Sequence, residues 1–278
     1  MSKGSWARFG LEVASAILAS LVLTSKPVSA AAFETPCPLP YDAIKKHHAI
    51  DDQCDSSGSH SNDKQARQNG AKNNYCAEGP AALVTQLSFR RLQAKTIALH
   101  IPQGAEGHFP SPRSTVHDIY QTSEGDVVGE GSLVKYVGYV LHAKYSNTGS
   151  GESCNCKHAG GAWNDVHINL GPTRQTSMCQ SIVAEMTPHF RPTHWDTTTL
   201  ELIRTHPVRI TGQLFFDSVH KPCTPGHSAS PPRTSLWEIH PVYSCDVCRK
   251  KKVADCPVDD ESVWEPIDHQ SVVAIPGR

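Results

Sequence analysis

The stretch 133–145 (LVKYVGYVLHAKY) is the feature that most limits how this chain can fold. It consists of thirteen residues, most of them β-branched, aromatic or aliphatic, with a glycine, Gly138, near its middle. An interior glycine in a strand marks a bend or bulge, which a strongly coiled barrel strand needs. The stretch therefore predicts a long, bent strand of a β-barrel.

Four shorter strands and one helix are predicted after it. The predicted strands cover residues 165–170 (DVHINL), 181–187 (SIVAEMT), 208–217 (VRITGQLFFD) and 235–242 (SLWEIHPV). The first of them alternates apolar and polar side chains, which is typical of a half-buried strand. Asp196 can cap a short helix over residues 197–204 (TTTLELIR). Pro241 indicates that the last strand ends there or lies at an edge.

The order strand, strand, strand, helix, strand, strand over residues 126–250 resembles the OB-fold. That fold is a five-stranded Greek-key barrel whose helix lies between strands three and four. The resemblance rests on element order and covers somewhat under half of the chain. It implies a mainly β protein with an OB-like barrel that holds an oligomeric ligand, such as a saccharide, a peptide or a nucleic acid, across its strand face.

The regions on either side of the predicted barrel look less regular. Residues 31–115 contain three cysteines, and residues 51–74 are rich in Ser, Asn, Gly, Asp and Gln. That composition cannot bury enough apolar surface to fold alone. A short helix is predicted from Pro80 to about Gln93, because proline is favoured in the first turn and apolar residues follow at near-helical spacing. Residues 251–278 are expected to form a C-terminal tail.

The first thirty residues have the features of a cleavable signal peptide. Lys3 and Arg8 precede an apolar run over residues 11–23, which is followed by Val28-Ser29-Ala30. A basic start, a short apolar centre and small residues at the end are what a signal peptidase recognises. We therefore expect a secreted or periplasmic protein with no stable membrane insertion after cleavage. The alternative is an uncleaved anchor.

All ten cysteines follow this segment, beginning at Cys37. An even number of cysteines in an exported chain predicts disulfides. The alternative is a zinc knuckle, since Cys154-x-Cys156 and Cys245-x-x-Cys248 have ligand-like spacing. Which cysteines are joined cannot be deduced from the sequence.

The charge balance argues against one class of partner. The chain has 26 basic and 27 acidic residues, and its formal net charge is −1. Proteins that hold phosphate backbones usually show a basic excess, and this chain does not.

Acidic and histidine side chains recur on the predicted strands. The candidates for catalysis are Asp165, His167, Glu185, Asp217, His220, Glu238 and His240. Spacing of i, i+2 places Asp165 with His167, and Glu238 with His240, on one face of each strand. Strand alternation alone also produces such pairs. If these faces converge, the histidines His167, His220 and His240, together with carboxylates, could bind zinc or another divalent metal. The same groups could act as a general acid and base without any metal.

Two classes of function follow. The first is an exported OB-like protein that binds an oligomeric ligand or serves as a scaffold. The alternative is a metal-dependent or acid/base hydrolase, nuclease-like only by analogy of fold. No G-x-S-x-G elbow, glycine-rich phosphate loop, EF-hand loop or H-E-x-x-H motif is present. The hydrolase hypothesis requires the seven side chains to approach one another within about 4–5 Å, as metal ligands do.

Overall fold

The computed structural model describes Met1 and residues 48–75, 77–104 and 108–267. The signal peptide predicted for residues 1–30 lies outside the described residues except for Met1, as do Cys37, Cys76 and residues 268–278 of the predicted tail. None of the described helices is long and apolar enough to cross a bilayer.

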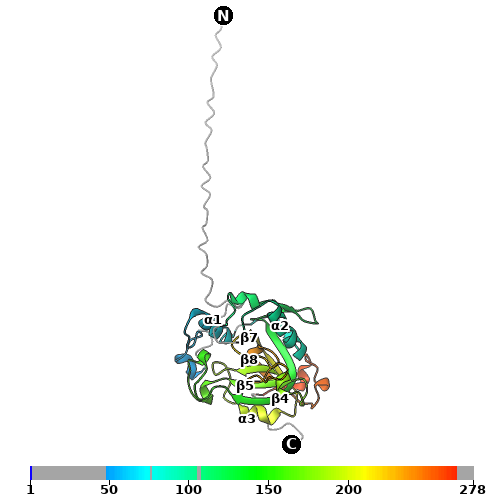
Figure 1. Ribbon diagram of the computed structural model, residues 1–278. Coiled ribbons are helices and arrows are strands. Elements are labelled where there is room, and N and C mark those ends of the chain that lie inside the picture. The colour runs from blue at the N-terminus through cyan, green and yellow to red at the C-terminus, as the bar shows by residue number, and fades with distance from the viewer. Residues whose placement is uncertain (2–47, 76, 105–107, 268–278) are drawn as a thin grey trace. The chain divides into compact units, whose positions relative to one another are not determined.

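Nine strands and three α-helices occupy the described residues (Figure 1). The helices are α1 (Asp63–Lys72), α2 (Gln86–Ala98) and α3 (Thr197–Ile203). The strands are β1 (Ala82–Leu83), β2 (Tyr120–Gln121), β3 (Val127–Val128), β4 (Leu133–Tyr145), β5 (Val166–Gly171), β6 (Ile182–Met186), β7 (Val208–Phe216), β8 (Trp237–Cys248) and β9 (Trp264–Pro266). The prediction of a mainly β protein is confirmed.

Five of the strands close into a barrel. Strand β4 pairs with β5, β5 with β6, β6 with β8 and β8 with β7, and β7 pairs back with β4. The β6–β8 pair is parallel and the other four are antiparallel. The long bent strand makes this closure possible, because β4 pairs with β7 through its first half and with β5 through its second half. Gly138 lies where the partner changes, and a Cβ there would be 2.5 Å from the Gly171 carbonyl oxygen.

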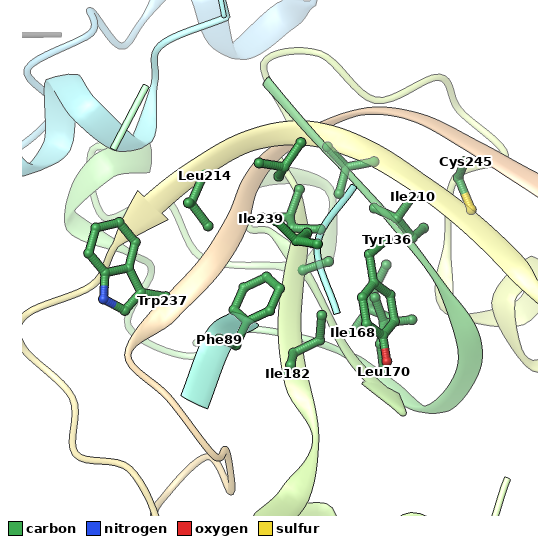
Figure 2. Close-up of a cluster of buried hydrophobic side chains, with 14 of the residues drawn as sticks. Phe89, Tyr136, Ile168, Leu170, Ile182, Ile210, Leu214, Trp237, Ile239 and Cys245 are labelled. Carbon is green, nitrogen blue, oxygen red and sulfur yellow. The ribbon is translucent and has the colours of Figure 1, made fainter. Parts of the chain in front are cut away.

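The barrel interior is apolar and closely packed (Figure 2). Ile168 and Leu170 of β5 face it together with Ile182 of β6 and Ile239 of β8, and all four are fully buried. Phe89 of α2 packs into the same cluster. Because side chains alternate along a strand, the residues between these point to the outside of the barrel.

The last barrel strand corrects a sequence prediction. Pro241 was expected to end the strand or lie at an edge, but β8 continues to Cys248 and lies between β6 and β7. The register shifts here, since Gly212 is opposite Val242 while Leu214 is opposite Ile239. Proline lacks an amide donor, and a bulge leaves one ladder position unpaired, so Pro241 fits without loss of a hydrogen bond.

The N-terminal region also differs from expectation. The segment 51–74, which was expected to be irregular, contains α1. Asn62 caps the start of this helix, because its side chain accepts a hydrogen bond from the Gln65 amide. The second helix begins at Gln86, later than the predicted start at Pro80, because Thr85 and Ser88 form a capping box there. The short strand β1 lies between Pro80 and the start of α2.

Disulfides are present as predicted. Cys54 is joined to Cys156, Cys179 to Cys223 and Cys248 to Cys256. Cys156 and Cys248 were members of the two zinc-like cysteine pairs, so neither pair is available as a knuckle. Disulfides of this kind are consistent with an extracellular protein. The Cys54–Cys156 bond also attaches the segment that contains α1 to the barrel.

Candidate functional site

The outer face of strands β5 to β8 is polar, and it is buried beneath α1. Outward-facing side chains on this face include His167, Glu185, Gln213, Glu238 and His240, each at most 3% exposed. Barrel strands usually present such residues to water. Here the end of α1 contacts Gln213, Glu185 and His240. Arg233 pairs with Glu238, so this part of the sheet is buried on its outer face as well.

Barrel side chains hold the end of this helix. The last carbonyl groups of an α-helix have no partner within the helix. Gln213 donates from Nε2 to the Ala71 carbonyl at 3.0 Å, and His240 donates from Nδ1 to the Lys72 carbonyl at 2.8 Å. The side chain of Asn74 also contacts Gln213. Polar contacts with the barrel, rather than an apolar stripe, therefore hold α1 in place.

A first cluster joins four of the predicted residues. His240 Nε2 lies 2.9 Å from Asp165 Oδ2 and 3.4 Å from Glu185 Oε2. His167 Nδ1 lies 2.9 Å from the other oxygen of Glu185, Oε1. Because β5 pairs with β6 so that His167 is opposite Glu185, the sheet register itself brings this pair together. Burial lowers the pKa of His167, which favours its neutral form.

Lys72, the last residue of α1, enters this cluster. Its Nζ lies 3.1 Å from Glu185 Oε2, and its side chain is 12% exposed. Burial alone would lower the pKa of Lys72, but Glu185 and other neighbouring acidic groups hold this pKa well above its usual range. In return, burial would raise the pKa of Glu185, but Lys72 and the two histidines hold it well below its usual range. Both members of this pair are thus charged at neutral pH.

A second cluster contains the other three predicted residues. Asp217 Oδ2 contacts His220 Nδ1 and lies 3.4 Å from Arg233 Nη1. The same Nη1 is 2.9 Å from Glu238 Oε2. Burial would raise the pKa of Asp217, but His220, Lys72 and Arg233 lower it, so its carboxylate is ionised. The pKa of Glu238 is raised instead, by burial and by the nearby Glu185 and Asp217.

The loop between β4 and β5 adds acidic groups that sequence reasoning did not identify. Glu152 Oε2 accepts hydrogen bonds from the Asp165 amide at 3.1 Å and from Asn155 Nδ2 at 3.2 Å. Asn155 also donates to Asp165 Oδ1 at 2.9 Å. Burial and the Asp165 carboxylate raise the pKa of Glu152. Cys154 is a buried thiol beside them, and burial raises its pKa as well.

A cleft lined by polar and apolar residues adjoins both clusters. It has a volume of about 390 Å³. Its lining includes Lys72 and Glu152 from the first cluster and Asp217 and His220 from the second. Other amide and charged side chains in the lining are Gln65, Gln68, Asn69, Asn147 and Lys157, and Phe109 and Val219 add apolar surface. The side chain of His220 is 35% exposed, and its Nε2 makes no hydrogen bond to a described residue.

The structure places all seven predicted site residues on this one face, but in two hydrogen-bonded clusters, and not within about 4–5 Å of one another as the predicted metal set required. It does not bring the three histidines of the predicted metal set to one point. Among the described residues, two sets of acidic, histidine and cysteine side chains bring their ligand atoms together. One set is Asp165, Glu185 and His240, and the other is Glu152, Cys154 and Asp165. Of the predicted histidines, only His240 belongs to either.

Lys72, Glu152 and Arg233 were missed because each lies outside the strands that carry the alternating pattern. No local signal connects them to the site. Lys72 reaches Glu185 across 113 residues of chain. No family model, no curated protein and no solved structure matches this chain. The site is therefore interpreted from its own geometry.

Proposed function

We propose that this protein is a hydrolase that acts on a polar substrate held in the cleft that α1 forms with the loops after β4 and β7. The observation that carries the proposal is the Asp217–His220 pair, in which a buried carboxylate contacts the Nδ1 of an imidazole that lines the cleft. This arrangement is the usual one for a general base, because the carboxylate orients the ring and stabilises the imidazolium that forms. His220 Nε2 would take a proton from the attacking water.

The other ionisable groups support the same proposal. A protein gains little stability from burying so many charges, because desolvation offsets most of the attraction between them. Dense clusters of this kind occur at functional sites, where neighbouring carboxyl groups are held in different protonation states. Glu152 has a raised pKa, lines the cleft and contacts the ionised Asp165, so it is placed to return a proton to a leaving group.

We also propose that the barrel is of the OB type. The parallel β6–β8 pair, the closure of β7 on β4 and the position of α3 between β6 and β7 in the chain support this assignment. Proteins with this fold commonly bind oligomeric ligands on the barrel surface. The fold by itself does not favour chemistry over binding.

A binding protein is the second candidate. The amides of the cleft favour it, because Gln65, Gln68 and Asn147 can hydrogen-bond a saccharide, a peptide or a nucleic acid without transferring a proton. The predicted export of the protein itself, by secretion or to the periplasm, is compatible with either candidate.

Hydrolysis of chromogenic substrates separates the two. Purified protein is assayed with nitrophenyl phosphodiesters, carboxylic esters and glycosides, with and without added zinc. We expect turnover of at least one class, and a fall in kcat/KM of about 100-fold or more in His220→Gln. His142→Gln is the matched control, because His142 is an exposed imidazole on β4. No turnover of any class, or equal rates in His220→Gln and the wild type, would contradict the proposal and favour ligand binding.

A further inference from the structure

The hydrogen bonding of His240 directs one of its ring nitrogens at two carboxylates. A backbone carbonyl can only accept, so Nδ1 of His240 carries the proton that it donates to Lys72 O. The second ring nitrogen, Nε2, faces Asp165 Oδ2 at 2.9 Å and Glu185 Oε2 at 3.4 Å. The bond at Nδ1 leaves Nε2 as the ring nitrogen that a metal ion would bind, and the two carboxylates converge on it.

The spacing of these three atoms suits such a cation. The ligand atoms of Asp165, Glu185 and His240 all lie within 4.8 Å of one another. Zinc binds nitrogen and oxygen ligands at roughly 2.0–2.2 Å, which places tetrahedral ligand atoms about 3.3 Å apart. The separations at His240 of 2.9 and 3.4 Å bracket that value. The Nδ1 bond to a backbone carbonyl is the outer contact that metal-binding histidines typically make.

The surroundings add a second indication. Glu238 is fully buried; its Oε2 pairs with Arg233 Nη1 at 2.9 Å, and its Oε1 has no hydrogen-bond partner among the described residues. Glu152 and Cys154 form a convergent set that shares Asp165. Lys72 donates to Glu185, and no hydrogen bond from it to Asp165 is present. Two further groups with possible ligand atoms, Glu152 and Cys154, therefore adjoin the three side chains.

We propose that Asp165, Glu185 and His240 form a divalent-cation site, and that the Lys72 ammonium competes with the cation for Glu185. A cation arriving from the cleft passes Glu152 and displaces Lys72, since both side chains line the cleft. An imidazole with two carboxylates favours zinc over calcium or magnesium, which prefer sites made entirely of oxygen. The site would supply metal-bound water to the proposed hydrolase, and to that extent this inference rests on the proposed function.

Titration calorimetry with zinc chloride tests the site. The disulfide-bonded protein is first freed of metal with a chelator. We expect one zinc per chain, and a Kd at least 100-fold weaker in His240→Ala and in Asp165→Asn. Lys72→Met should bind zinc at least tenfold more tightly, because the competing charge is gone; a variant that has failed to fold cannot show such a gain. His142→Ala and Lys144→Met, both at exposed positions on β4, are the matched controls and should stay within twofold of the wild type.

Three results would overturn the proposal: no zinc binding by the wild type, equal affinity in the wild type and His240→Ala, or weaker binding in Lys72→Met. Loss of zinc in Cys154→Ser with retention in His240→Ala would assign the ion to the Glu152–Cys154–Asp165 set, and would also overturn it. The readout is independent of catalysis. Zinc binding without turnover would leave this site standing and contradict the hydrolase, whereas turnover without zinc binding would contradict this site alone.

Discussion

The two faces of strands β5 to β8 are equally buried but differ in composition. The inner face carries side chains such as Ile168 and Ile239, which need no partner other than close neighbours. The outer face carries His167 and Glu238, which need hydrogen bonds and counter-charges to be buried at all. An apolar outer face would have been covered at lower cost. Retention of charges beneath α1 therefore supports the functional role proposed for this face.

The inner face should show the largest loss of stability on substitution. Ile168→Ala removes buried methyl groups from the centre of β5, and we expect it to cost about 4 kcal/mol of unfolding free energy. Chemical denaturation of the disulfide-bonded protein measures this cost. Zinc affinity of the folded variant should be unchanged, because the side chain faces away from the site. A cost below about 1 kcal/mol would show that the interior is not closely packed.

The outer face should lose somewhat less, and the loss should depend on pH. Asp217→Asn breaks the contacts with His220 and Arg233, and we expect a cost of about 3 kcal/mol near pH 7. Because the folded pKa of Asp217 lies below its unfolded value of about 3.9, the wild type has this stability above that value. The wild type loses it as the pH falls towards the folded pKa.

The difference between wild type and Asp217→Asn should therefore shrink below about pH 4. Denaturation curves at several pH values between 7 and 2.5 test this trend. A difference that stays constant across the range would mean that the stability lost in Asp217→Asn does not come from the carboxylate charge.

An exposed ion pair provides the smallest effect. Glu261 is 73% exposed and pairs with Arg209, which also lies 2.9 Å from Asp246. Arg209 thus keeps a partner in Glu261→Gln, and we expect a cost below about 0.5 kcal/mol. Thermal denaturation in low and high salt measures it. A cost as large as that of Asp217→Asn would remove the distinction between buried and exposed charges on this barrel.

Sequence reasoning found the elements whose signals are local. Alternation in residues 165–170 and the Asp196 cap predicted β5 and α3, and the structure has both within one residue at each end. Alternation also suggested that Asp165 and His167 share a strand face, as do Glu238 and His240, while Glu185, Asp217 and His220 were named from their positions on or after predicted strands. Convergence on one face could not be predicted, because it depends on the pairing of β5 with β6 and of β6 with β8.

The parts that were missed depend on tertiary contacts. Helix α1 has the sequence DKQARQNGAK, which has no apolar stripe, so no helical period identifies it. It forms where Asn62 caps its start and where Gln213 and His240 donate hydrogen bonds to the carbonyl groups at its end. The contribution of Lys72 to the site could not be predicted for the same reason, since it exists only once the helix is docked.

The Cys54–Cys156 bond has a consequence for the order of assembly. Its two cysteines are 102 residues apart, and Cys156 follows β4 in the chain. During synthesis the segment containing α1 emerges first, yet it cannot be fixed covalently until the longest barrel strand has also emerged. The covering helix is thus early in the sequence, but its covalent attachment can form only after β4 has been made and in the presence of an oxidant.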